Sequence, residues 1–156
     1  MSLRLAACEK FGKNQEQLNR GSFVSLPLKP TQEENPMPKY VDGFGVPVPT
    51  KNLEAYRRMS QKAGKIWREH GALEYRECAG DDLNNKFGVS FPAGIKAKKG
   101  ETVVSAWIVY KSRAHRDRVN AKVMKDPRMI EDMDMKTLPF DCKRMLYGGF
   151  KTIVEA

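Results

Sequence analysis

The sequence has few of the residues from which metal and cofactor sites are most often built. Of its 156 residues, three are cysteine (Cys8, Cys78 and Cys142) and two are histidine, His70 and His115. The cysteines lack the short paired spacing of a metal site, and their odd number favours a reduced compartment. HExxH motifs, glycine-rich phosphate loops and nucleophile elbows are absent as well. We therefore expect neither a metal nor a cofactor.

Long apolar runs are also missing from the sequence. None approaches the roughly 20 residues that are needed to span a membrane. LAAC at residues 5–8 is similar to a lipoprotein cleavage box. A signal peptide, however, requires an apolar core of about 7–15 residues before its cleavage site, and none is present. We expect a cytoplasmic protein that has no membrane partner.

The charge is positive but dispersed along the chain. The formal net charge is +9, and residues 37–156 hold 23 basic against 15 acidic residues. A basic domain can attract nucleic acid or another anion. Here acidic side chains are interspersed among the basic ones, which favours a solvated surface over a nucleic-acid interface. Nucleic-acid binding is thus the least favoured of our functional hypotheses.

The stretch TQEENPMPKYVDGF, residues 31–44, raises the question of where the folded domain begins. Gln32-Glu33-Glu34 is encoded by CAR-GAR-GAR, which can spell the AGGAGG of a bacterial ribosome-binding site ahead of an ATG at Met37. Residues 1–36 also show no sustained hydrophobic period, which is typical of a disordered arm. We expect residues 1–36 to be a translated leader or such an arm, and residues 37–156 to form one domain.

From Met37 onward the chain alternates between strand and helix patterns. Strands are expected at 39–46, 73–78, 102–110 and 144–154. One helix is expected between Asn52, as its cap, and Gly71, as its stop, and a second after Ser112. The order β-α-β-β-α-β predicts an α+β, ferredoxin-like fold with an antiparallel sheet. Because the strands are apolar on both faces, we expect two sheets to pack together in a homodimer.

Four segments carry a resemblance to a known family: MPKYVDGF, WREHGALEYRE, SAWIVYKSRAHRDRVNAKVMKDPRM and YGGF, in that order. Together they resemble the YbaA-like bacterial family, over essentially all of residues 37–156. The resemblance implies a dimeric α+β barrel, in which two ferredoxin-like sheets pack face to face. That superfamily includes monooxygenases, haem-degrading enzymes and isomerases, but a fold does not transfer a reaction. The resemblance assigns no site residue.

Asp42 is the first candidate for chemistry, since it is a carboxylate in an apolar, glycine-rich strand. Strand alternation places it on one face with Tyr40 and Phe44, where burial would raise its pKa and make it a base. The alternative is an edge-strand aspartate that pairs with a lysine or arginine. Glu77, which shares a face with Tyr75 on the second strand, is a possible second carboxylate.

His115 and several aromatic residues complete the candidate site. His115 lies in the first turn of a helix, where the dipole favours a neutral imidazole that can accept a proton. The alternative is a surface histidine among arginines, whereas His70 is read as a helix cap. Trp107, Tyr110 and Tyr147 are candidate ligand contacts, although such aromatics also serve as core or dimer interface.

These residues support two main hypotheses. The first is a homodimer that binds a small, largely apolar ligand and acts as a cofactor-independent oxidoreductase or isomerase, with Asp42, Glu77 and His115 as its catalytic groups. The second is a non-catalytic binding or stress-response module in which residues 80–100 form a lid or a dimer arm. RNA binding through the sheet is disfavoured because YGGF lies on the fourth strand, not on the third.

Overall fold

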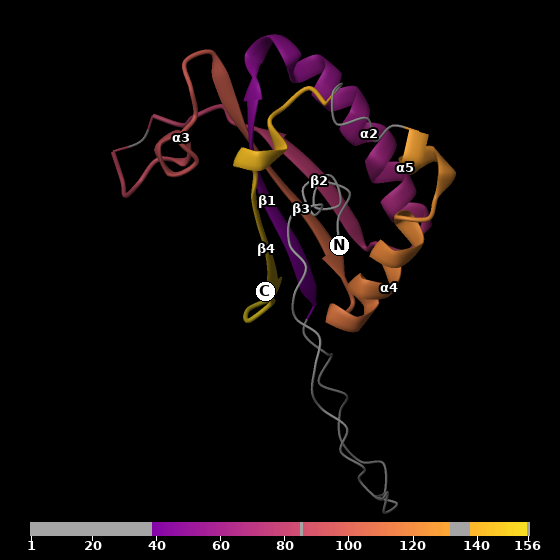
Figure 1. Ribbon diagram of the computed structural model, residues 1–156. Helices are drawn as coiled ribbons and strands as arrows, with labels where there is room; N and C mark the ends of the chain where they lie inside the picture. The colour runs from indigo at the N-terminus through magenta and orange to yellow at the C-terminus, as the bar shows by residue number, and fades with distance from the viewer. Residues whose placement is uncertain (1–38, 85, 132–137, 156) are drawn as a thin grey trace, which may run out of the picture.

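The computed structural model describes residues 39–84, 86–131 and 138–155, and the predicted leader or arm at residues 1–36 lies outside them. These residues form four strands and two long helices, with short helical turns in several of the connections (Figure 1). In chain order the elements are β1 (Tyr40–Pro49), η2 (Thr50–Asn52), α2 (Leu53–Glu69), β2 (Glu74–Ala79), α3 (Phe91–Gly94), β3 (Glu101–Tyr110), α4 (Arg113–Val123), α5 (Pro127–Glu131), η3 (Cys142–Arg144) and β4 (Leu146–Lys151).

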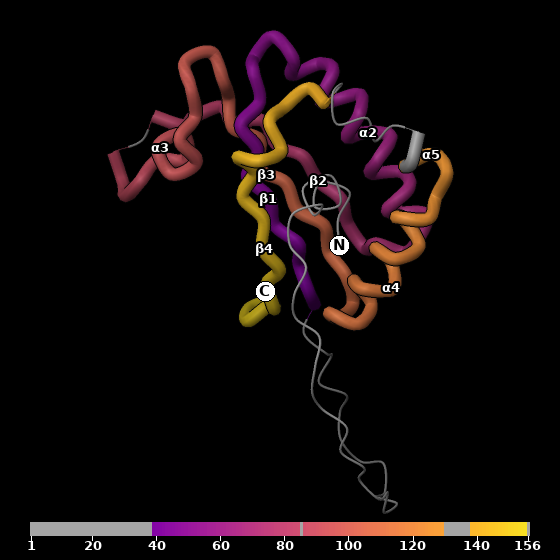
Figure 2. Tube along the Cα trace, in the orientation of Figure 1, coloured from indigo at the N-terminus to yellow at the C-terminus, as the bar shows by residue number. Residues whose placement is uncertain are grey.

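The four strands form one antiparallel sheet in the order β2-β3-β1-β4. The helices α2, α4 and α5 lie on one side of this sheet (Figure 1). The segment that carries α3 projects away from them (Figure 2). This strand order and the one-sided helices are those of the ferredoxin-like fold, so the predicted fold class is confirmed.

The helix ends follow the local sequence, with one exception. Gly71 takes a positive φ of 109° directly after α2, as expected of a helix stop. Ser112 caps α4, since its hydroxyl accepts a hydrogen bond from His115 N at 3.2 Å. Asn52 occupies the predicted N-cap position of α2, but its side chain makes no capping hydrogen bond: it donates to Pro139 O at 3.0 Å, which ties the start of α2 to the chain before β4.

The first strand is longer than the prolines suggested. β1 was expected to end before Pro47, but it continues to Pro49 and pairs there with β3. β4 accompanies β1 only as far as Gly45, so beyond this point β1 has a paired strand on one side only. Proline is tolerated at such a position because the missing N–H can face the unpaired side.

Alternate strand residues face the helices and form the core. The buried apolar side chains on this face come from β1, β3, α2 and α4, and include Val46, Val48, Val104, Ile108, Tyr56, Ile66, Trp67, Val119 and Val123. Asp42 and Tyr110 lie on the same face, toward the end of the sheet where α4 begins. Within the described part of the chain, no helix is long and apolar enough to span a membrane.

Candidate functional site

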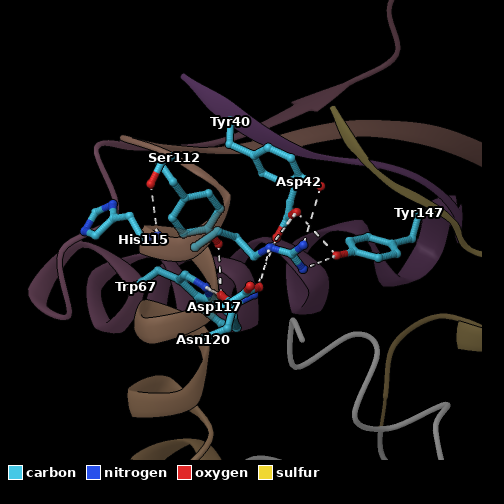
Figure 3. A network of polar contacts seen from close by, with 10 residues as sticks. Tyr40, Asp42, Trp67, Ser112, His115, Asp117, Asn120 and Tyr147 are labelled. Carbon is cyan, nitrogen blue, oxygen red and sulfur yellow. Dashed lines mark hydrogen bonds and ion pairs between the residues drawn. The ribbon is translucent and has the colours of Figure 1, made fainter. Parts of the chain in front are cut away.

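A cluster of polar side chains lies inside this otherwise apolar layer, between the sheet and α4 (Figure 3). Asp42 on β1 and Asn120 on α4 are fully buried, and the side chain of Arg116 is 12% exposed. Tyr40 and Tyr147 come from the neighbouring strands β1 and β4. Buried charges in proteins are normally paired, and the contacts of this cluster show how that requirement is met here.

Asp42 is held by three groups, none of them close. Tyr147 Oη donates to Asp42 Oδ1 at 3.3 Å and Asn120 Nδ2 donates to Oδ2 at 3.5 Å. The Nε of Arg116 lies 3.8 Å from Oδ1. Charge-assisted hydrogen bonds in proteins are typically about 2.7–2.9 Å long. The carboxylate is therefore surrounded by donors without being locked by any one of them.

Arg116 connects this carboxylate to the two tyrosines. Its Nη1 donates to Tyr147 Oη at 3.3 Å and its Nη2 to Tyr40 Oη at 3.5 Å, with the guanidinium carbon 5.1 Å from the centre of the Tyr40 ring. The Nε also lies 3.1 Å from Asp117 Oδ1, but this contact makes no hydrogen bond. Nε is thus a buried donor without an acceptor in the described residues.

A glycine on β4 makes room for this arrangement. Gly149 lies opposite Asp42 in the sheet, and a Cβ at this position would lie 2.2 Å from Tyr40 Oη. Only glycine therefore allows the Tyr40 ring to lie across β4 toward Arg116. The paired glycines of the last strand thus have a local role at Gly149, which is to seat a side chain of the cluster.

Asn120 anchors the inner side of the cluster through hydrogen bonds that are shorter than those to Asp42. Its Oδ1 accepts hydrogen bonds from Trp67 Nε1 and from Tyr110 Oη, both at 3.0 Å. These two donors fix the orientation of the amide, so its Nδ2 points toward Asp42. Asn120 follows Arg116 by four residues on α4, which places both side chains on one helix face.

Burial is the main cause of the shifted pKa values in the cluster. It raises the pKa of the Asp42 carboxyl, although Arg116, Asn120 and Tyr147 oppose the shift. Burial and the nearby Asp42 charge raise the pKa of Tyr147 to about 12, and burial raises the pKa of Tyr110 as well. The phenols therefore stay protonated as donors, beside a carboxylate that is more basic than an exposed one.

The predicted site residues fall into two groups. The structure brings Asp42, Tyr40, Tyr147 and Tyr110 together in this cluster. His115 lies beside it, with its ring 6.3 Å from that of Tyr110 (Figure 3). Its Nδ1 accepts a hydrogen bond from Lys111 N at 3.1 Å. Burial and neighbouring cations lower the pKa of His115, in the direction expected for a neutral imidazole.

Glu77 and Trp107 lie away from Asp42. Glu77 is on the edge strand β2, where Tyr56 Oη and Tyr75 Oη each donate to its carboxylate at 2.8 Å. Trp107 lies opposite Gly43 on the sheet face that points away from the helices, and its Nε1 donates to Glu74 Oε1 at 2.9 Å.

Sequence reasoning missed Arg116, Asn120 and Trp67 as members of the cluster. The available signal was the spacing of Arg116 and Asn120 on the helix face that also carries Val119 and Val123. Within the described residues, no group of three or more His, Cys, Asp or Glu side chains is placed to hold a metal ion.

The sheet order, the one-sided helices and the enclosed cluster define a ferredoxin-like α+β protein. A crystal structure described as a dimeric ferredoxin-like protein from an uncultured marine organism has the same fold, with a TM-score of 0.50 and 13% identity over 76% of this chain and 99% of that chain. Residues 39–142 match a family described as a protein of unknown function, DUF1428.

Sequence comparison identifies the family more closely. The chain is 45% identical over 117 residues to the uncharacterized protein YbaA of Escherichia coli K12, and equally to the YbaA proteins of Escherichia coli O157:H7 and Shigella flexneri. The match covers 75% of this chain and 98% of each relative. The chain belongs to this YbaA-like, DUF1428 family, and the resemblance inferred from its four sequence segments is confirmed.

Proposed function

We propose that this protein is a homodimer that binds a small, largely apolar molecule and moves a proton on it without a cofactor. One observation carries the proposal: a fully buried carboxylate, Asp42, whose pKa is raised by burial, lies between the Arg116 guanidinium and the Tyr147 hydroxyl. A base of raised pKa beside hydrogen-bond donors is the arrangement that proton abstraction next to a carbonyl requires.

Isomerisation is the reaction that these groups can complete by themselves. Asp42 takes a proton from the carbon next to a carbonyl, and the resulting enolate oxygen accepts hydrogen bonds from Arg116 and Tyr147. The same carboxyl then returns the proton to a different carbon, so that no electron acceptor is consumed. An oxidase reaction would start from the same deprotonation but needs O2 as the oxidant, and it is the second form of the proposal.

Substrate reaches Asp42 past the partly exposed side of the cluster. Asp42 and Asn120 are fully buried, whereas Tyr40, Tyr147 and Arg116 are each partly exposed. The contacts of Asp42 with these outer residues are long, so a substrate oxygen can replace one of them at small cost. We infer that the substrate enters between Tyr40 and Tyr147.

The test uses small β,γ-unsaturated ketones such as 3-cyclohexenone, whose conversion to the conjugated isomer is followed by its ultraviolet absorbance. We expect the wild-type protein to accelerate this conversion for some members of a panel and Asp42→Asn to abolish the acceleration. Asp82→Asn, which removes an exposed carboxylate in the β2–β3 connection, is the matched control. Equal rates for wild type and Asp42→Asn across the panel would reject Asp42 as the base.

The homodimer part of the proposal rests on the sheet face that the helices leave open. Phe150 and Leu146 on β4 are 59% and 53% exposed on this face, and Trp107 on β3, which pairs with Gly43 of the intervening strand β1, lies on the same face. Exposed apolar patches of this kind mark protein interfaces. The structurally similar marine protein is described as dimeric, which supports the same assembly here.

Native mass spectrometry tests the assembly directly. We expect a dimer for the wild type and a folded monomer for Phe150→Glu, because the added charge would be buried between the two sheets. The β2–β3 connection carries a second set of exposed apolar side chains, Phe87 and Val89. If Phe87→Glu also yields a monomer, the connection is a dimer arm, whereas a Phe150→Glu dimer contradicts packing through the sheet.

A further inference from the structure

A groove lies between α2 and the edge strand β2, apart from the Asp42 cluster. Its volume is about 630 Å³, within the range of roughly 300–1,000 Å³ that is usual for small-molecule sites. Six of its lining residues lie on one face of α2 and a seventh ends that helix, while two come from β2. They are Arg57, Ser60, Gln61, Gly64, Lys65, Arg68, Glu69, Tyr75 and Glu77.

The wall of the groove is fixed by close packing. A Cβ at Gly64 would lie 2.7 Å from Cδ1 of Tyr75, so the tyrosine ring occupies the space that any larger residue would fill. The Tyr75 hydroxyl donates to Glu77 at 2.8 Å, and its ring lies 6.1 Å from that of Trp67. An aromatic ring is thereby held in place at the groove by the glycine, the carboxylate and the core tryptophan.

The charges around the groove are unequally neutralised. Arg57 makes two 2.8 Å hydrogen bonds to Glu54, and Glu69 pairs with Arg128 at 2.8 Å. Arg68 donates to the uncharged Ala72 O at 2.9 Å.

In the part of the chain that the structure describes, neither Lys65 nor Arg68 has a carboxylate within ion-pair distance. The two cations are three residues apart on one helix face. They are therefore two cations without a direct ion-pair partner among the described residues that line the groove together with the Tyr75 ring, although Arg68 is near enough to Glu74 to lower the pKa of that carboxyl.

We propose that this groove binds a small aromatic carboxylate. Lys65 and Arg68 hold the carboxylate, and the Tyr75 ring packs against the aromatic body of the ligand. The Glu77 carboxylate in the same groove disfavours a ligand with a second negative charge, since like charges repel strongly at a partly buried site. None of the residues that line the groove belongs to the Asp42 cluster, although Trp67, which lies against the Tyr75 ring, also donates to Asn120. The proposal needs no proton transfer at Asp42.

The test is an NMR titration of the full chain with benzoate, benzyl alcohol, benzylamine and inorganic phosphate as separate probes. We expect benzoate alone to shift the amide signals of Gly64 and Tyr75 in a saturable manner. Binding of benzylamine or benzyl alcohol as tight as that of benzoate would overturn the role of the cations. Equal binding of phosphate, or no shift by benzoate at these two residues, would overturn the aromatic carboxylate site.

A pair of lysine variants on α2 supplies the control. Lys65→Ala should weaken benzoate binding by about tenfold, the loss expected for one charge-assisted hydrogen bond. Lys62→Ala changes the net charge of the same helix equally but lies outside the groove lining, so it should leave the affinity unchanged. Equal affinities for the two variants would contradict the proposal. Matching amide spectra of the ligand-free variants show that both are folded.

Discussion

Asn120 offers the most direct test of how the polar cluster is built. In Asn120→Ala, the Trp67 Nε1 and Tyr110 Oη donors, both now at 3.0 Å from the Asn120 oxygen, would lose their acceptor in a fully buried site. Each orphaned buried donor costs about 1–3 kcal/mol, so we expect a loss of about 4 kcal/mol in the free energy of unfolding. The total free energy of unfolding of a globular protein is only about 5–15 kcal/mol, so this loss would be a large part of it.

Urea unfolding measures this loss. With a urea slope of about 1–3 kcal/mol per molar, typical of small domains, the midpoint should fall by about 2 M. Protein concentration must be the same for all variants, because dimerisation makes the midpoint concentration-dependent. A loss below about 1 kcal/mol would show that Trp67 and Tyr110 find other partners, and that Asn120 does not anchor the cluster.

Asn120→Asp is the matched variant, since it keeps the Oδ1 acceptor and the side-chain shape. It also places a second carboxylate oxygen where Nδ2 now lies, 3.5 Å from Asp42 Oδ2. Two carboxylates so close share a proton, so the folded pair binds more protons than the unfolded chain does. The variant should therefore regain stability as the pH falls from 7 toward 5. A pH-independent deficit would contradict this account.

Three further predictions concern single side chains. The folded pKa of Asp42 is raised above its ordinary value of 3.8, so the stability that Asp42 contributes is present below pH 3.8 and is lost as the pH rises through the folded pKa. Urea midpoints of the wild type should therefore be lower at pH 7 than at pH 4, and Asp42→Asn should reduce this difference. Asp126 is the opposite case, because the Arg128 side chain lowers its pKa. The stability that Asp126 contributes is therefore present above pH 3.8 and is lost on acidification. Asp126→Asn should lower Tm more at pH 7 than at pH 3. Gly149→Ala should displace the Tyr40 ring and lower stability by about 1–3 kcal/mol, measured by the same urea titration.

The fold could be predicted because its signals are local. Gly71 stops α2 through its own backbone conformation, and Ser112 caps α4 through a hydrogen bond to His115 N, three residues away. The end of β1 could not be predicted in this way. Pro47 is tolerated because β4 accompanies β1 only as far as Gly45, which is a property of the assembled sheet.

The candidate site was partly predictable for a geometric reason. Tyr40 and Asp42 are two residues apart on one strand, so alternation alone places them on the same face. Trp107 and Tyr110 are three apart, which by the same rule places them on opposite faces, and the structure shows this separation. Our prediction that Trp107 and Tyr110 both contact one ligand therefore conflicts with strand alternation, which could be read from the sequence alone.

Arg116 and Asn120 could not be found from strand patterns, because they come from α4 and meet Asp42 only through tertiary packing. Asn120 makes two 3.0 Å hydrogen bonds at full burial, which is the geometry of a group that fixes the core. The Asp42 contacts differ, since they range from 3.3 to 3.8 Å around a fully buried carboxylate.

Replacing a buried ion pair with apolar side chains is often neutral or stabilising, so stability alone gives little reason to bury Asp42 and Arg116 together. A loosely held pair that lies against a well-fixed amide is instead suited to exchanging partners. Asn120 should therefore govern unfolding, whereas Asp42 should govern proton transfer. Asn120→Ala that retains catalysis per folded molecule, together with Asp42→Asn that loses catalysis under conditions where urea titration shows it to be folded, would separate the two roles.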